Sequence, residues 1–80
     1  FNPRTTLRWV QPRAGRATLT VHDAAGRAVV TLFDGTAEAG EHEAVWNGKD
    51  ATGRAVASGV YYARLRTAGA DESRPMVLLK

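Results

Sequence analysis

The sequence predicts an all-β fold, a seven-stranded antiparallel Ig-like β-sandwich that forms one small domain. Several short runs alternate apolar and polar residues, which is the pattern of strands with one buried face. Clusters of Gly, Pro, Asn and Asp separate these runs at short intervals, as turns do in sandwiches. No run of ten or more residues spaces its apolar side chains as a helix would.

Three strands are expected in the first half, at residues 5–10, 16–22 and 27–33. Leu7 and Trp9 share one face of the first strand, and Leu19 and Val21 share one face of the second. The apolar residues of the third strand do not alternate cleanly, so we expect either a β-bulge there or a strand with both faces partly covered. The Asp34-Gly35 pair should end this strand, and a loose surface loop should follow up to residue 40.

Four more strands are expected, at residues 41–46, 54–57, 60–67 and 73–79. His42 and Trp46 share a face of the first of these strands that we expect to point inward, which places His42 at the edge of the core beside Trp46. Tyr61 lies on the inward face of its strand and Tyr62 on the outward face. Pro75 stands near the start of the last strand, which suits an edge strand. A polar loop should connect the last two strands at residues 68–72.

The core should form around the large apolar side chains on the inward faces of these strands. Its expected members are Leu7, Trp9, Leu19, Val21, Leu32, Trp46, Tyr61, Leu65 and Leu78.

Residues 46–62 form the stretch around which the chain is organised, since a strand ends there on a tryptophan and the next begins with two tyrosines. Between them lie an Asn-Gly pair and an Asp-x-x-Gly turn, in which Gly accepts positive φ and Asp bonds its own backbone. A calcium loop would need several carboxylates, whereas only Asp50 is ionised here with Lys49 beside it. We therefore expect an Asx-type turn. The structural core and turn residues are Trp46, Asn47, Gly48, Asp50, Gly53, Gly59 and Tyr61.

Composition limits the possible functions. A chain of 80 residues forms one domain, and it buries roughly 60% of its unfolded surface. There is no cysteine, so disulfides and thiolate chemistry are excluded. No apolar run approaches the length of a membrane span. The net charge is +3, but the arginines are scattered among acids rather than clustered, so we expect no nucleic-acid partner.

The chain carries no complete catalytic set. The two serines are Ser58 and Ser73, and Ser58 lacks the glycine two residues before it that a nucleophile elbow needs. His22 and His42 show no metal-ligand spacing, and the acids have no apolar surroundings that would raise a pKa for acid catalysis. We therefore expect no enzyme activity, no metal and no cofactor.

Aromatic side chains leave one binding hypothesis open. Tyr61 and Tyr62 could form a sugar-stacking platform with Trp9 or Trp46. The alternation of the strand points Tyr61 inward and Tyr62 outward, which favours a core role for Tyr61 and Trp46. A carbohydrate-binding role for Tyr62 or Trp9 remains as an alternative.

Four segments resemble, in the right order, the motifs of one group of bacterial domains. Residues 46–61 read Trp-Asn-Gly-Lys-Asp-x-x-Gly-Arg-x-Val-x-Ser-Gly-Val-Tyr, and residues 21–29 read Val-His-Asp-x-x-Gly-Arg-x-Val. Residues 1–9 resemble the group's Asn-Pro opening, and residues 76–80 its closing strand. The chain therefore resembles the Ig-like β-sandwich shared by the C-terminal sorting domain of type IX secretion substrates and the Ig-like domain of the flagellar hook-capping protein.

The resemblance to sorting domains implies a non-catalytic C-terminal module of a larger secreted bacterial protein, used for sorting or cell-surface attachment. By the same resemblance, the signal would lie in the last strand, at Met76, Val77, Leu78, Leu79 and Lys80. A terminal edge strand suits this role, because a partner can reach its backbone without unfolding the core.

The expected partners are secretion or attachment machinery and upstream domains of the same polypeptide, at the cell surface or outside the cell after export through the periplasm. The resemblance to hook-capping proteins implies an alternative, a scaffold that assembles with copies of itself. A passive spacer and a binding module are further alternatives.

Overall fold

The computed structural model describes residues 4–79, so the expectations at residues 1–3 and at Lys80 lie outside the described residues. Six β-strands form the described chain, all paired antiparallel. They are β1 (Thr5–Gln11), β2 (Gly15–Asp23), β3 (Ala28–Ala37), β4 (Gly40–Trp46), β5 (Gly59–Thr67) and β6 (Ala70–Leu78).

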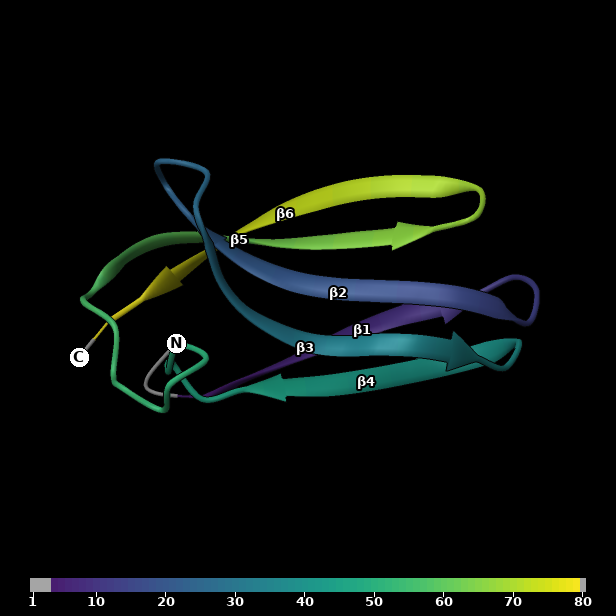
Figure 1. The fold of residues 1–80 in the computed structure, drawn as a ribbon, viewed down its shortest axis with the longest axis horizontal. Coiled ribbons are helices and arrows are strands. Elements are labelled where there is room, and N and C mark those ends of the chain that lie inside the picture. The colour runs from purple at the N-terminus through teal and green to yellow at the C-terminus, as the bar shows by residue number, and fades with distance from the viewer. Residues whose placement is uncertain (1–3, 80) are drawn as a thin grey trace.

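The strands form two sheets of unequal width. One sheet has two strands in the order β1-β4, and the other has four in the order β3-β2-β5-β6. Figure 1 shows the β1–β4 pair on the β3 side of the molecule and the β5–β6 hairpin on the opposite side. The all-β antiparallel architecture is as predicted, with six strands in residues 4–79 rather than seven.

The expected strand at residues 54–57 is the one that does not form. Residues 47–58 instead make a loop that holds a single isolated bridge between Lys49 and Ala55. The Val56 amide donates to the Gly48 carbonyl at 3.0 Å. The loop therefore folds back on itself, which leaves too few residues in line for a strand.

The third strand is longer than predicted. Its pairing with β2 shifts register between Leu19 and Thr20 and again between Val21 and His22, so the predicted irregularity is confirmed. Asp34 and Gly35 do not end the strand, because β3 continues to Ala37 against the first residues of β2. Turn-forming residues can stay extended when a neighbouring strand supplies the hydrogen bonds.

The β5–β6 hairpin is tighter than predicted. Thr67 pairs directly with Ala70, so the connection is a turn at residues 68–69 rather than a loop over 68–72. Pro75 pairs with Tyr62 in the middle of β6. The prediction that this is an edge strand is confirmed, because β6 is the last strand of the four-stranded sheet.

The core consists of two clusters, named here the Trp46 cluster and the Trp9 cluster. The two tryptophans lie four residues apart along the β1–β4 ladder, since Thr5 pairs with Trp46 and Trp9 with His42. The Trp46 cluster contains Val21, Trp46, Tyr61 and Leu78, and the Trp9 cluster contains Trp9, Leu19 and Ala63. The other predicted core residues, Leu7, Leu32 and Leu65, are only partly buried and pack against these clusters.

Candidate functional site

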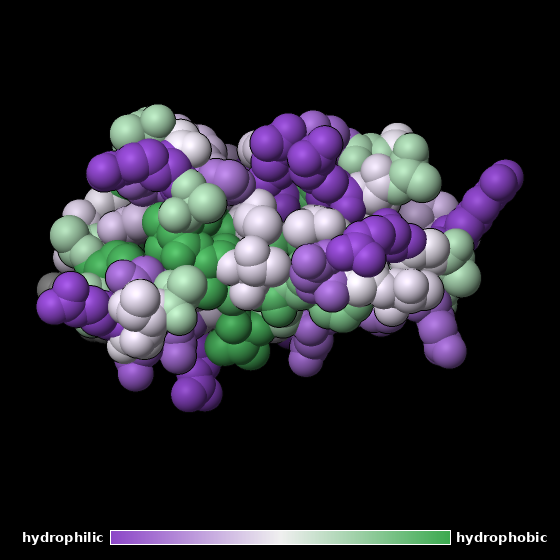
Figure 2. Space-filling model, viewed as in Figure 1, coloured by the Kyte–Doolittle hydropathy of each residue, from purple (hydrophilic) through white to green (hydrophobic). Residues whose placement is uncertain are grey.

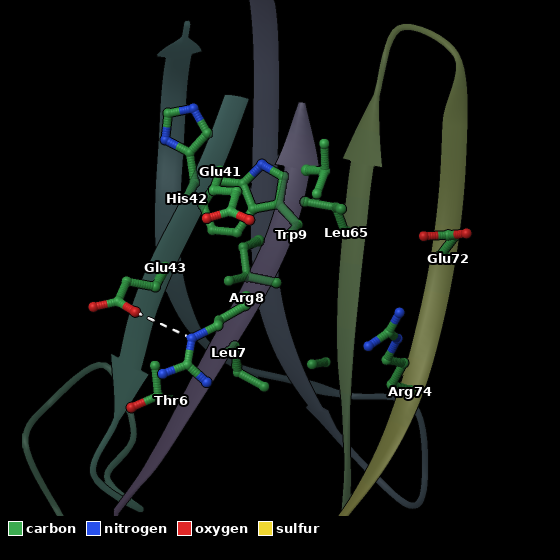
Figure 3. A pocket seen from close by; sticks show the side chains of 13 residues that line it. Thr6, Leu7, Arg8, Trp9, Glu41, His42, Glu43, Leu65, Glu72 and Arg74 are labelled. Atoms are coloured by element: carbon green, nitrogen blue, oxygen red, sulfur yellow. Dashed lines mark ion pairs between the residues drawn. The ribbon is translucent and has the colours of Figure 1, made fainter. Parts of the chain in front are cut away.

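A groove of about 850 Å³ lies between β1 and the inner face of the β5–β6 hairpin. It exists because two strands cannot cover a sheet of four, and β1 and β4 lie on the β3 side. Figure 3 shows Trp9 from β1 beside Leu65 from β5, with charged side chains on both flanks. The apolar lining consists of Leu7, Trp9, Val10, Leu19, Ala63 and Leu65.

Trp9 is held firmly at the base of this groove. Its indole Nε1 donates to Gln11 Oε1 at 3.3 Å, and Gln11 Nε2 donates to the Gly15 carbonyl at 3.5 Å. Gln11 is the buried polar residue of the described core, with 3% exposed surface. Burying an amide without partners would be costly, so these bonds explain how a glutamine can lie under the ring.

His42 lies beside Trp9, which corrects the prediction that it sits beside Trp46. The two rings stack with centroids 5.2 Å apart and an interplanar angle of 20°. Because Trp9 and His42 are directly opposite in the β1–β4 ladder, their side chains share a face. Trp46 lies four residues further along β4, out of reach of the imidazole. The predicted inward face of His42 is therefore confirmed, whereas its predicted neighbour, Trp46, is wrong.

Charged residues of both signs border the groove. Arg8 Nε lies 3.3 Å from Glu43 Oε2 on the rim formed by β1 and β4 (Figure 3). Across the groove, Glu72 and Arg74 lie on the face of β6 that also carries Met76 and Leu78. Neither Glu72 nor Arg74 has an ion pair with any residue in 4–79. The inner face of β6 therefore changes from apolar to charged where the smaller sheet no longer covers it.

The loop at residues 47–58 covers Trp46, which is buried and has no groove beside it in the described chain. The Trp46 indole Nε1 donates to the Lys49 carbonyl at 2.9 Å, and the ring meets Tyr61 edge to face with centroids 5.2 Å apart. The Tyr61 hydroxyl donates to the Ala57 carbonyl at 2.6 Å. Both side chains are buried, which fits the predicted core role, and the loop supplies the polar partners that their N–H and O–H groups need.

The Asx turn at Asp50 forms as predicted. Asp50 Oδ1 accepts hydrogen bonds from the Thr52 amide at 2.9 Å, the Thr52 hydroxyl at 2.7 Å and the Arg54 amide at 3.0 Å. The Thr52 side-chain bond, then the Arg54 backbone bond, lower the pKa of the Asp50 carboxyl below its ordinary value. Gly53 and Gly48 have φ values of 85° and 74°, which favour glycine. Asn47 is exposed beside the buried Gly48, and Gly59 begins β5.

A second turn repeats this geometry. Asp23 Oδ1 accepts from the Ala25 amide at 3.0 Å and the Arg27 amide at 2.9 Å, and these bonds, the Arg27 backbone bond first, lower the pKa of Asp23. Residues 23–29 and 50–56 both read Asp-Ala-x-Gly-Arg-Ala-Val, a match that sequence reasoning missed. The two turns are joined, because the Ala51 amide donates to the Val29 carbonyl at 3.1 Å.

The predicted sorting strand lies at the exposed end of β6. Leu78 is fully buried and Met76 half-buried, whereas Val77 and Leu79 are 51% and 59% exposed. Lys80 lies outside the described residues. Val77 pairs with Val60 on the outer face of the four-stranded sheet, and Val60 is also exposed. Figure 2 shows apolar surface gathered left of centre in this view, with hydrophilic side chains around it.

The structure does not assemble a sugar-stacking platform from the four aromatic side chains. Tyr61 is buried against Trp46, while Tyr62 lies on the outer face of the sheet. Trp9 faces the groove on the inner side. Since Tyr62 and Trp9 lie on opposite sides of the four-stranded sheet, no one sugar ring could contact both.

The outer face also carries an ion pair between Arg64 and Asp71. Arg64 donates to both carboxylate oxygens of Asp71, at 2.9 and 2.7 Å. The Arg66 Nε atom lies 3.9 Å from Asp71 Oδ2. The side-chain bond from Arg64 lowers the pKa of Asp71, and Asp71 in turn raises the pKa of Arg64. Both side chains remain well exposed, so the pair adds little to stability.

Candidate catalytic residues remain dispersed. His22 Nε2 lies 2.9 Å from the Thr20 hydroxyl, and Ser73 is an exposed residue on the outer face of β6. Residues 4–79 contain no group of three or more His, Asp or Glu side chains that could hold a metal ion. Over the same residues, we find no helix with the length and apolar character to cross a membrane.

Comparison with known proteins then identifies the domain. The family model described as the FlgD Ig-like domain matches residues 4–71. The chain belongs to the FlgD Ig-like domain family. A solved structure, FlgD from P. aeruginosa, matches with a TM-score of 0.71 and 21% sequence identity. That match covers 92% of this chain and 58% of the other, so the chain spans little more than half of its relative's length. A search of curated proteins finds no similar sequence.

This family membership selects between the two groups that the sequence resembles. It supports the hook-capping group, and it gives no support to the type IX sorting domain. The Ig-like sandwich is confirmed by the structural match. Membership in the FlgD Ig-like family is also consistent with the expectation that the chain has no enzyme activity.

Proposed function

We propose that this domain is a non-catalytic scaffold module of the flagellar hook-cap type, which contributes binding surface to an extracellular assembly. The match of the FlgD Ig-like model over residues 4–71 is the observation that carries the proposal. An exported flagellar scaffold is consistent with a location at the cell surface or beyond it. Its partners would be neighbouring copies and other domains of the same polypeptide.

The geometry suits such a role. The Trp46 cluster is buried and hydrogen-bonded to its loop, while the groove and an exposed apolar strand end are available for contacts. A scaffold needs surfaces that partners recognise, whereas it needs no perturbed acid or nucleophile. The dispersed serines and histidines fit this division.

The test is to delete the coding sequence for residues 4–79 from the parent gene in the source organism, then count flagellar hooks by electron microscopy. Loss of hooks, with the remaining parent protein still exported, is the expected result. The parent protein's surface level is followed by immunoblotting of intact and fractionated cells.

Two results would contradict the scaffold role. Normal hooks together with loss of the parent from the cell surface would favour the sorting function, with Met76 to Lys80 as its signal. Normal hooks with normal surface levels would favour a passive spacer. A control strain in which only Arg16 and Asp34 exchange charges should behave as the parent strain does, because both side chains are exposed and far from the groove.

A further inference from the structure

The free edge of β1 is the starting point. Within residues 4–79, β1 pairs with β4 alone, so its other edge presents backbone N–H and C=O groups to the groove. An unpaired edge of this kind is a template for another strand. The inner face of β5 and β6 lies opposite, and the part of it that carries Leu65, Glu72 and Arg74 lines the groove.

The two edges that border the groove differ in their protection. On β6, Pro75 lacks an N–H group and the charged residues Asp71, Glu72 and Arg74 precede it, which are features that discourage strand addition. On β1, no proline interrupts Thr5–Gln11, and Val10 is 66% exposed. The β1 edge is therefore better suited to strand addition than the β6 edge.

We propose that an extended segment of a separate polypeptide docks in this groove as an added β-strand, paired with the free edge of β1 and facing β5 and β6. This gives the smaller sheet a third strand and covers Trp9 and Leu65. The groove would then be a docking surface of the scaffold proposed above, and its biological role depends on that proposed function.

Charge complementarity defines the chemistry of the segment. Glu72 and Arg74 point into the groove two residues apart and have no ion-pair partner in residues 4–79. Met76 follows on the same face beyond the groove lining, half-buried against the Trp46 and Trp9 clusters. Side chains of an added strand alternate between the groove and solvent. Every second residue of the segment therefore faces Glu72, Arg74 and Met76 on β6.

The direction of the strands sets the order of those residues. Figure 1 shows β1 and β6 running in opposite directions. A segment that pairs antiparallel with β1 therefore runs in the same direction as β6. Its inward residues are, in order, a base opposite Glu72, an acid opposite Arg74 and an apolar residue opposite Met76, with polar residues between them.

The test uses two acetylated and amidated peptides with the 80-residue chain. The matching peptide is Thr-Lys-Thr-Asp-Thr-Val-Thr, and the exchanged peptide is Thr-Asp-Thr-Lys-Thr-Val-Thr. Binding is followed by the fluorescence of Trp9 in a Trp46→Phe background and by backbone amide shifts. The matching peptide should bind roughly tenfold more tightly, because like charges disfavour the exchanged one. The shifted amides should lie on β1 and on the inner face of β5–β6.

A charge exchange within the groove sharpens the result. The double variant Glu72→Arg with Arg74→Glu keeps the net charge and should reverse the peptide preference. The matched control exchanges the exposed pair Arg16 and Asp34 (Arg16→Asp with Asp34→Arg), which lies outside the groove, and should leave the preference unchanged. Both side chains in the groove are exposed, so neither double variant should unfold the domain.

Several outcomes would overturn the proposal. They are no binding of either peptide at millimolar concentration, an unchanged preference in the Glu72 and Arg74 variant, and amide shifts confined to other surfaces. A dimer whose formation itself covers Trp9 would assign the groove to a second copy. A longer parent chain whose own upstream residues protect the β1 edge would assign it to the same polypeptide. Each result is obtained with purified protein, so it is distinct from a failure of hook assembly in cells.

Discussion

The two tryptophans mark two ends of one core that differ in how they are covered. Trp46 is 1% exposed beneath the loop at residues 47–58, and its N–H group bonds to that loop. Trp9 is 8% exposed, its N–H group bonds within β1, and its surroundings open into the groove. Both lie on inward faces of paired strands. The difference shows that a loop beyond the strands decides which end is sealed and which can accept a partner.

The largest effect should come from truncating the sealed tryptophan. Trp46→Ala should lower the free energy of unfolding by about 3–5 kcal/mol, because it removes the ring from a closed cluster and leaves a cavity. Trp9→Ala should cost about 1–3 kcal/mol, since that ring already borders the open groove. Urea denaturation measures both. Equal losses would mean that the two ends are covered alike.

The loop that seals the Trp46 cluster depends on its turn. Gly53 has a φ of 85°, where a side chain is strained, so Gly53→Ala should cost roughly 1–2 kcal/mol. Gly69→Ala is the matched control, because Gly69 is not among the glycines with positive φ and a Cβ there meets nothing within 4 Å. The control should change the free energy of unfolding by less than about 0.5 kcal/mol. A similar loss for both variants would remove the special role of the Asp50 turn.

The hydroxyl groups of Tyr61 and Tyr62 provide a second comparison between the sealed cluster and the open surface. Tyr61→Phe deletes the bond to the Ala57 carbonyl and should cost about 1 kcal/mol. Tyr62→Phe deletes a hydroxyl on an exposed ring and should leave the thermal midpoint unchanged. If Tyr62→Phe destabilises the domain as much, the outer face must carry a contact of the Tyr62 hydroxyl.

The smallest expected effect is on the stability of the domain at acidic pH. The folded-state pKa values of Asp50 and Asp23 are lowered from 3.8, so each carboxylate stabilises the fold above about pH 4 and loses this contribution as the pH falls through its folded pKa. Asp50→Asn and Asp23→Asn should each flatten the fall of the melting temperature between pH 4 and pH 2. Thermal scans across this range measure it. If the melting temperature of both variants falls between pH 4 and pH 2 as steeply as that of the unmodified chain, other groups must be responsible for the acid sensitivity.

Local chemistry in the sequence was sufficient for much of the fold. Alternation located the strands, and the Asp50 turn followed from Asx chemistry because its bonds join near neighbours. The inward placement of Trp46 and Tyr61 also followed from period-two spacing. Errors arose at the ends of elements, as at β3, where pairing with β2 overrides the Asp34-Gly35 turn signal.

The groove could not be predicted in the same way. Its existence depends on how many strands each sheet contains and which strand lies at each edge, and these are pairings between distant residues. The sequence predicted a seventh strand at residues 54–57, which is a loop in the structure, and it did not divide the strands between the two sheets. The repeated Asp-Ala-x-Gly-Arg-Ala-Val pattern was visible in the sequence, and it would have indicated two equivalent turns.

The first residues of β1 and the last residues of β6 lie at the same end of a molecule 36 Å long (Figure 1), and this has a mechanical consequence. A force that pulls on both strands there would act at the end of the β1–β4 and β5–β6 ladders. Antiparallel ladders loaded at one end open one hydrogen bond after another, since their bonds lie across the strands. Tension at this end would therefore load the cross-strand hydrogen bonds one after another, whereas a load pressing on the faces would be carried by the packed core.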